Sequence, residues 1–155
     1  MPDEYFIPWL SSNIIALILL FFCWKYPKIG RYAYAIIFLL AAFINITTAI
    51  GSPELYLEYS KWTFLKVYER FIEGYFKEHI TGFVTIIGLG QLLVSLGLLI
   101  GSYFYKPALI GGLLFAIGIL PLGMGSGFPA PVFMIMSFWL LLTNKKINIP
   151  ESSIS

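Results

Sequence analysis

The chain has 155 residues, of which 59% are hydrophobic and 12% are charged, and its formal net charge is +2. Because a soluble domain carries about 25% charged residues, this composition predicts an integral membrane protein with one domain over residues 1–155. It excludes nucleic acid as a partner, which would require a basic stripe. One cysteine (Cys23) and one histidine (His79) are too few for an internal disulfide or for the common zinc and haem sites.

Five apolar segments predict an all-α fold, a five-helix transmembrane bundle. A spanning helix needs about 20 mostly apolar residues, because the hydrocarbon core of a bilayer is about 30 Å thick. The last two segments are short and are joined by a turn rich in glycine and proline. They form either two tilted spans, which we favour, or a re-entrant hairpin. The five segments cover residues 5–24, 32–50, 80–100, 107–122 and 129–143.

Basic residues alternate sides along the chain and predict its orientation. Short cytoplasmic loops are enriched in lysine and arginine. Such residues follow the first, third and fifth segments, whereas the start of the chain is acidic and the long loop has five glutamates against four basic residues. We therefore expect the N-terminus outside, the C-terminus in the cytoplasm and no cleaved signal peptide. The basic residues are Lys25, Lys28, Arg31, Lys106, Lys145 and Lys146, and the expected interfacial aromatic residues are Trp9, Trp24, Tyr26, Tyr32, Tyr103 and Tyr105.

The long loop over residues 51–79 is predicted to contain an amphipathic helix on the outer membrane surface. Ser52, Pro53 and Glu54 have the pattern of a helix start, with a capping serine and a proline in the first turn. From residue 64 onward, apolar residues recur at helical spacing opposite charged ones. The apolar face of this helix would consist of Phe64, Tyr68, Phe71, Ile72 and Tyr75.

This surface helix has two interpretations. It is a structural lid that closes the bundle, which we favour, or it is a lid over a ligand pocket. In the second case its side chains contact the ligand directly. The candidates for such contacts are Tyr68, Glu69, Arg70 and His79.

Polar and small residues form a stripe along the third apolar segment. Exposing a carboxamide or hydroxyl to lipid is costly, so these residues should face the bundle interior. The stripe is either a packing seam between helices, which we favour, or the lining of a cavity in which Gln91 contacts a ligand. The stripe consists of Thr81, Thr85, Gly88, Gln91 and Ser95, and a GxxxG contact motif of Gly97 and Gly101 follows it.

Asn45 and Thr48 share a face near the outer end of the second segment. A threonine hydroxyl can bond to a carbonyl of the preceding helical turn. An asparagine amide cannot be satisfied in this way, so Asn45 needs another partner. A structural contact with Gln91 is favoured over a ligand site, and Asn45 and Thr48 are both candidates for lining a pocket.

The turn over residues 121–131 has glycines at alternate positions, Gly123, Gly125 and Gly127. Glycine allows the backbone to approach another group closely. Irregular backbone at membrane depth must be buried in protein or must line a wet cavity. The turn is therefore either a tight hairpin or one wall of an outer-facing pocket that also includes Asn45 and the long loop.

Residues 31–143 resemble the DoxX-like small membrane proteins. The resemblance rests on the run RYAYAIIF at 31–38 followed by AAFIN at 41–45, on GQLLVSLGLLIG at 90–101, and on the pair Gly111-Gly112. It implies a four-helix core, here with one additional N-terminal span, in the inner (plasma) membrane of a prokaryote. For some members of the family it also implies an association with quinol-linked and thiol-linked redox systems.

Two classes of function follow from these features. The first is a non-catalytic membrane subunit, or a lipid- or quinone-binding protein with an outer-facing pocket. Its partners would be membrane lipids and other membrane subunits or a second copy of the chain. The alternative is the membrane component of a quinol-linked oxidoreductase complex. A transporter ranks lowest, because intramembrane charges and a clear inverted repeat are missing from the sequence. We expect no catalytic residues and no metal site, and the bound group we consider is a quinone or a lipid.

Overall fold

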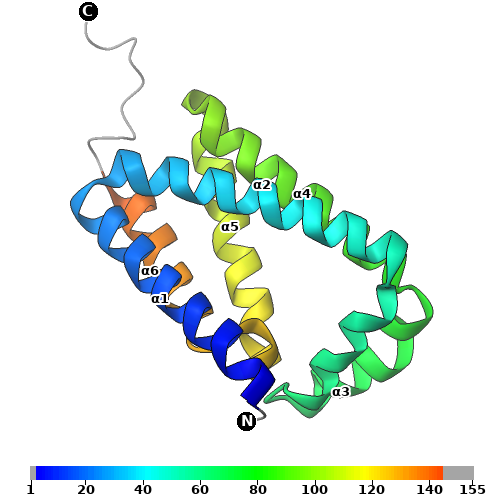
Figure 1. Cartoon of the computed structure of the whole chain (residues 1–155). Coiled ribbons are helices and arrows are strands. Elements are labelled where there is room, and N and C mark those ends of the chain that lie inside the picture. The colour runs from blue at the N-terminus through cyan, green and yellow to red at the C-terminus, as the bar shows by residue number, and fades with distance from the viewer. Residues whose placement is uncertain (1–2, 145–155) are drawn as a thin grey trace, which may run out of the picture.

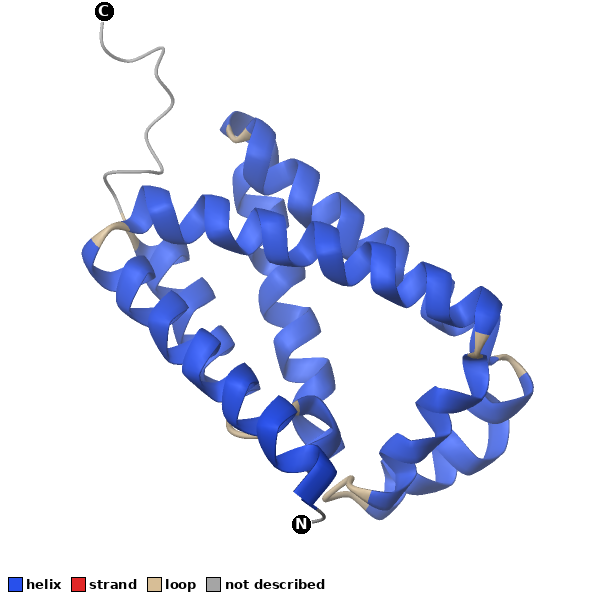
Figure 2. Cartoon of the chain, viewed as in Figure 1, coloured by secondary structure: helices blue, strands red, loops and turns tan. Residues whose placement is uncertain are grey.

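The computed structural model describes residues 3–144, with side chains from residue 5 onward, and over this range the chain forms helices and turns without a β-strand (Figure 2). Short 3₁₀ segments and one π-helical turn connect or extend the α-helices. The elements in chain order are α1 (Asp3–Lys25), α2 (Pro27–Gly51), η1 (Pro53–Lys61), α3 (Lys66–Phe71), η2 (Ile72–Phe76), α4 (Ile80–Ile100), η3 (Ser102–Phe104), α5 (Tyr105–Ile119), η4 (Leu120–Ser126) and α6 (Ala130–Thr143).

Four helical stretches are long and apolar enough to cross a membrane, so the chain is an all-helical, multi-pass membrane protein. α6 is apolar but has only 14 residues. α2 begins at Pro27, five residues before the predicted apolar segment. Lys28 and Arg31 belong to its first turns, because the long stems of basic residues let a helix continue to the membrane interface. The four stretches are Tyr5–Lys25, Pro27–Gly51, Ile80–Ile100 and Ser102–Ser126.

The five apolar helices contact one another in a closed order that differs from their order in the chain. α1 contacts α2, α2 contacts α4, α4 contacts α5, α5 contacts α6, and α6 contacts α1 again. Figure 1 shows α1 alongside α6 and α2 alongside α4, with α5 between these two pairs. The first and last described helices are therefore neighbours.

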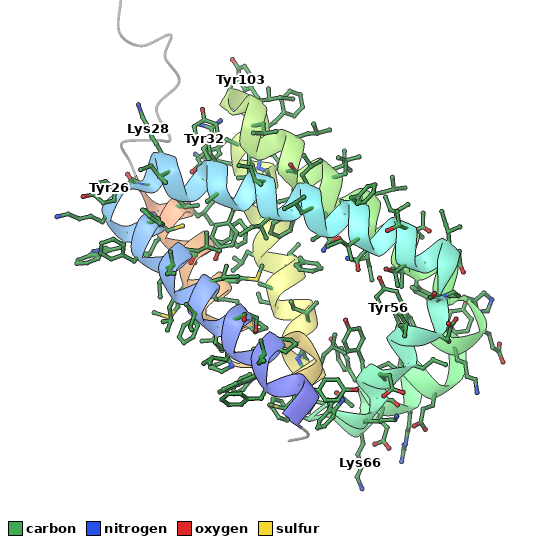
Figure 3. The ribbon with its side chains drawn as sticks, in the orientation of Figure 1. Tyr26, Lys28, Tyr32, Tyr56, Lys66 and Tyr103 are labelled. Atoms are coloured by element: carbon green, nitrogen blue, oxygen red, sulfur yellow. The ribbon has the colours of Figure 1, made fainter. Side chains whose placement is uncertain are left out.

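The bundle has two chemically different ends. At one end, here called the basic end, α1 turns into α2; Lys28, Tyr26, Tyr32 and Tyr103 gather there (Figure 3). At the other end, here called the loop end, lie the start of α1, the end of α5 and the segments η1, α3 and η2 (Figure 1). Basic and aromatic side chains at one end are typical of a membrane interface.

The main core lies near the basic end and is built around Phe138 of α6. The Phe138 ring is fully buried, with the Tyr34 ring centroid 4.7 Å away and the Phe38 ring centroid 5.7 Å away. Gly112 allows this arrangement, because a Cβ at that position would lie 2.5 Å from the Phe138 ring. Gly112 thus brings the α5 backbone against an aromatic ring.

Arg31 closes the basic end of α4. Its guanidinium donates hydrogen bonds to the carbonyls of Leu98 (2.5 Å) and Leu99 (3.2 Å), which are in the last turn of the helix. The cation also lies over the Tyr32 and Tyr105 rings, 5.1 and 4.8 Å from their centroids. Carbonyls at a helix C-terminus lack intrahelical partners and carry partial negative charge, so an arginine stabilises this end.

In the long loop, the region predicted to be amphipathic forms two connected helical segments, α3 and η2. α3 passes into the π-helical turn η2, in which Gly74 departs from helical geometry (φ −102°, ψ −111°). Of the predicted apolar face, Ile72 is buried, whereas Phe71 and Tyr75 are 42% and 60% exposed; Phe76, which was not on that face, is also buried. Phe64, placed on the same predicted face, precedes α3 and is 59% exposed.

The start of this loop also departs from the prediction in one respect. A helix does begin at Pro53, but it is the 3₁₀ segment η1. Ser52 occupies the position before it without making a side-chain capping hydrogen bond. The backbone N–H of Ser52 donates to the Thr48 carbonyl at the end of α2, and its carbonyl accepts from the Leu55 N–H, so this residue ends one helix and starts the next through its backbone.

Candidate functional site

The polar residues predicted on α2 and α4 meet in a hydrogen-bonded seam. The Asn45 amide donates to Gln91 Oε1 over 2.7 Å and accepts a hydrogen bond from the Tyr56 hydroxyl over 2.7 Å (Figure 3 labels Tyr56). The predicted contact between Asn45 and Gln91 is confirmed. Because η1 supplies the second partner, the Asn45 amide is satisfied by protein on both sides, and Thr48 lies beside the same tyrosine hydroxyl.

The rest of the stripe on α4 also serves packing. The Ser95 hydroxyl, fully buried, donates to the Ala35 carbonyl over 2.7 Å, and the Thr81 hydroxyl donates to the Ala49 carbonyl over 3.0 Å. At Gly88 a Cβ would lie 2.6 Å from the Ile46 side chain. The stripe is therefore the contact line between α2 and α4, as the favoured interpretation predicted.

The candidate residues of the long loop do not converge with Asn45 and Gln91. The Tyr68 hydroxyl donates to the Gly118 carbonyl at the end of α5 over 3.0 Å. The His79 ring stacks on Tyr75 with centroids 4.5 Å apart, and its Nδ1 lies 3.0 Å from the Tyr75 carbonyl oxygen. Glu69 and Arg70 are exposed.

The three glycines of the turn before α6 each meet a different part of the protein. A Cβ at Gly123 would collide with the Trp62 carbonyl, one at Gly125 would lie 2.5 Å from the Tyr59 ring, and one at Gly127 would lie 2.6 Å from the Ser12 hydroxyl. Gly123 and Gly127 also have positive φ values of 62° and 73°, which favour glycine. The predicted close approach of this backbone is thus observed at all three positions.

Hydrogen bonds attach the same turn to α1 on one side. The Trp9 indole Nε1–H donates to the Phe128 carbonyl over 2.7 Å, and the Asn13 amide donates to the Gly127 carbonyl over 2.9 Å. Both donors are on the face of α1 that points into the bundle, and Asn13 is only 8% exposed. A carbonyl in a bent backbone needs a donor when water is excluded, so these side chains stabilise the turn.

On its other side the turn is bound by the segment between η1 and α3. The Pro121 carbonyl accepts hydrogen bonds from the Thr63 hydroxyl (2.6 Å) and from the backbone N–H of Phe64 (2.9 Å). The Phe64 ring packs edge-on against Phe128, with centroids 5.2 Å apart. The turn is therefore held between α1 and the long loop, two segments that are far apart in the sequence.

A pocket of about 380 Å³ lies where these three segments meet, and we call it the aromatic pocket. Figure 1 shows the end of η1 reaching the start of α1 beside η4 at the loop end. The Tyr5 and Trp62 rings form part of its wall, with centroids 5.6 Å apart and planes inclined by 58°. The lining residues are Tyr5, Pro8, Trp9 and Ser12 of α1, Glu58, Tyr59 and Trp62 of the long loop, and Met124, Gly125, Ser126 and Gly127 of the turn.

One carboxylate stands among the described residues that line the aromatic pocket. Both Glu58 oxygens lie 2.7 Å from Lys61 Nζ, and the two side chains are 47% and 62% exposed. This hydrogen bond raises the pKa of Lys61, and burial raises the pKa of Tyr59, so the tyrosine remains neutral. The pocket is therefore lined by aromatic residues and by one carboxylate whose basic neighbour is on the surface.

Sequence reasoning identified the glycine wall but missed the residues opposite it. Gly125 and Gly127 line the aromatic pocket, and Gly123 lies against the Trp62 carbonyl next to it. Trp9 was expected to be an interfacial anchor, and Tyr59 and Trp62 carried no predicted role. The sequence feature that pointed to the pocket was the spacing of the glycines, because glycines at alternate positions indicate a backbone that packs against large side chains.

No family model, curated protein or solved structure matches this chain. The resemblance to DoxX-like proteins therefore remains a prediction. Within residues 3–144, no group of three or more histidine, cysteine, aspartate or glutamate side chains is placed to hold a metal ion.

Proposed function

We propose that this chain is a non-catalytic membrane protein that binds the polar end of a lipid-like molecule in the aromatic pocket. The observation that supports this most is the construction of the pocket, in which a glycine-rich turn and the aromatic residues Tyr5, Trp9, Tyr59 and Trp62 form the walls. Ligand pockets typically enclose about 300–1,000 Å³. A volume of about 380 Å³ suits a head group rather than a whole lipid, whose chains would remain in the bilayer.

In this proposal α6 is a short fifth span, with the N-terminus outside the cytoplasm. Its 14 residues extend about 21 Å, less than the hydrocarbon thickness of about 30 Å. The turn before α6 then lies at membrane depth, where irregular backbone must be covered by protein. α1 and η1 provide that cover.

In the proposed family relationship, the DoxX-like four-helix core corresponds to α2, α4, α5 and α6. The aromatic pocket draws four of its lining residues from α1, which is the additional N-terminal helix. The binding function would then belong to this addition, whether the chain acts alone or as a subunit of a larger complex.

A quinol-linked oxidoreductase component is less well supported by the same geometry. Quinone carbonyls need hydrogen-bond donors, and three of the side-chain donors at the pocket are already used, which leaves the Tyr5 and Tyr59 hydroxyls and the Trp62 indole N–H. Trp9 donates to Phe128, Ser12 donates to the Trp9 carbonyl, and Ser126 donates to the Gly123 carbonyl. The Glu58 carboxylate favours a cation over a quinone, because a carboxylate and a quinone carbonyl are both hydrogen-bond acceptors and cannot pair.

Native mass spectrometry of protein extracted gently from its own membrane tests the proposal. Gly125→Leu would push the new side chain against Tyr59 and fill the pocket. Gly82→Leu is the matched control, because a Cβ at Gly82 has nothing within 4 Å. We expect a lipid to remain on the wild type and on Gly82→Leu but to be lost from Gly125→Leu. Wild-type protein without bound lipid, or the same amount of bound lipid on all three proteins, would overturn the proposal.

A further inference from the structure

We infer that the aromatic pocket recognises a zwitterionic alkylammonium phosphate, the head group of phosphatidylcholine or phosphatidylethanolamine. This inference rests on the proposed lipid-binding function and specifies its ligand. It follows from two features of the pocket that have separate physical origins: the arrangement of the aromatic rings, and the ion pair at the edge.

The aromatic rings supply a site for the ammonium group. The face of an indole or phenol ring carries partial negative charge and attracts cations, and quaternary ammonium ligands are held in cages of such rings. Tyr5 and Trp62 form two inclined walls, with centroids 5.6 Å apart. Trp9 and Tyr59 line the same space, and Gly125 lets the Tyr59 ring lie directly on the backbone of the turn.

The ion pair of Glu58 and Lys61 matches the two charges of the head group. Glu58 lines the pocket beside the rings, so an ammonium group there has both π-faces and a carboxylate as partners. Lys61 Nζ lies 2.7 Å from the carboxylate and is 62% exposed, which leaves it free to turn toward a phosphate at the mouth. Exposed ion pairs contribute little to stability, so exchanging partners costs little.

This charge arrangement also discriminates between lipid classes. An anionic lipid such as phosphatidylglycerol would bring a phosphate to the pocket without a cation to pair with Glu58. The carboxylate would then be left beside a like charge, which is unfavourable when water is partly excluded. A zwitterionic head group instead exchanges the single ion pair of Glu58 and Lys61 for two ion pairs, one between its ammonium group and Glu58 and one between its phosphate and Lys61.

Tryptophan fluorescence provides the test, because the chain has four tryptophans and two of them, Trp9 and Trp62, line the pocket. The other two, Trp24 and Trp139, are exposed on the bundle surface and are replaced by phenylalanine to isolate the pocket signal. The purified protein in maltoside is titrated with short-chain phosphatidylcholine, phosphatidylethanolamine and phosphatidylglycerol. We expect saturable changes with the first two and at least tenfold weaker binding of the third.

Substitutions then test separately the part of the site that would bind the ammonium group and the part that would bind the phosphate. Glu58→Gln should weaken phosphatidylcholine binding at least tenfold, whereas Glu73→Gln, an exposed control on η2, should not change it. Lys61→Met should weaken binding of the lipid but not of tetramethylammonium, which has no phosphate. Tyr5→Leu leaves the ion pair intact and should weaken both ligands. Thermal unfolding of each variant verifies that it folds.

The outcomes separate the inference from the proposed function. Equal affinity for phosphatidylglycerol and phosphatidylcholine, or an unchanged affinity in Glu58→Gln, would overturn the zwitterion inference while leaving lipid binding intact. Binding of tetramethylammonium alone, without any lipid, would also overturn it. If all three lipids fail to alter the pocket fluorescence and the native protein carries no lipid, the proposed function fails as well.

Discussion

Gly97 lies where α4 packs tightly against α5, and Gly97→Ala tests whether the bundle depends on that approach. A Cβ at Gly97 would lie 2.7 Å from the Ala108 Cβ and 3.0 Å from the Phe104 carbonyl oxygen. Carbon atoms in good contact are about 3.5–4.0 Å apart, so the helices would have to separate by about 1 Å. The predicted helix contact at this GxxxG motif would then be loosened.

The expected magnitude is the difference between two opposing effects. Overpacking of a well-packed interior costs about 1–3 kcal/mol. Replacing glycine by alanine within a helix contributes about 0.5–1 kcal/mol in the opposite direction. We therefore expect Gly97→Ala to lower the free energy of unfolding by about 1–2 kcal/mol, measured by equilibrium unfolding in mixed micelles of maltoside and dodecyl sulfate with circular dichroism.

Two further variants separate the collision from helix propensity. Gly90→Ala is on the same helix, and a Cβ there has nothing within 4 Å, so it should be neutral or stabilising. Adding Ala108→Gly to Gly97→Ala removes the nearest colliding atom and should recover part of the loss, giving a coupling of about 0.5–3 kcal/mol. Equal stability of Gly97→Ala and Gly90→Ala, or zero coupling with Ala108→Gly, would refute the reasoning.

Substitutions at three other residues test separate features of the structure. Ser95→Ala removes a buried hydrogen bond to the Ala35 carbonyl and should cost about 0.5–1.5 kcal/mol in the same unfolding assay. Arg31→Met leaves the Leu98 carbonyl uncapped and should cost about 1–2 kcal/mol; Arg31→Lys should recover only part, because an ammonium lacks the planar fork, and full recovery would contradict this account. Burial raises the pKa of Tyr59, so its contribution to stability is present below the unfolded value near 10 and is lost as pH rises through the higher folded value. The melting temperature of Tyr59→Phe should therefore fall less than that of the wild type as the pH is raised above 10. Identical dependence of the two melting temperatures on pH would show that this tyrosine does not contribute.

The seam between α2 and α4 could be predicted from the sequence because lipid makes polar residues informative. An amide in a membrane helix needs a partner, and few residues can provide one. Asn45 and Gln91 were therefore recognisable as a pair, and the structure confirms their contact. The role of Tyr56 was not predictable in this way, because a tyrosine in an extramembrane loop has water as an alternative partner.

The amphipathic helix of the long loop shows where periodicity fails. The spacing of Phe71 and Tyr75 matches an ideal helix of 3.6 residues per turn. One π-helical turn, which contains Gly74, alters that spacing and buries Phe76, which was not on the predicted face, together with Ile72, which was. Single π turns leave little trace in a hydropathy pattern, because they change the direction of side chains without changing their order.

The sequence predicted one wall of the aromatic pocket, the glycine turn, but not the opposite wall, and the reason is topological. Glycines at alternate positions of the turn indicated that the backbone would lie against something, and the structure confirms this at Gly125 and Gly127. The opposing residues come from α1 and η1, which are distant in the sequence. Their identity depends on the closed order of the helices, with α6 beside α1, and a single sequence does not state that order.

This closed order has a consequence for the biogenesis of the protein in the membrane. Trp9 and Asn13 enter with the first helix, but their acceptors on Phe128 and Gly127 are 119 and 114 residues further along the chain. During synthesis the Trp9 indole and the Asn13 amide cannot form these two hydrogen bonds until the turn before α6 has been made. The α1 side of the bundle is therefore completed late, because its hydrogen bonds to the turn require the chain to be synthesised through residue 128.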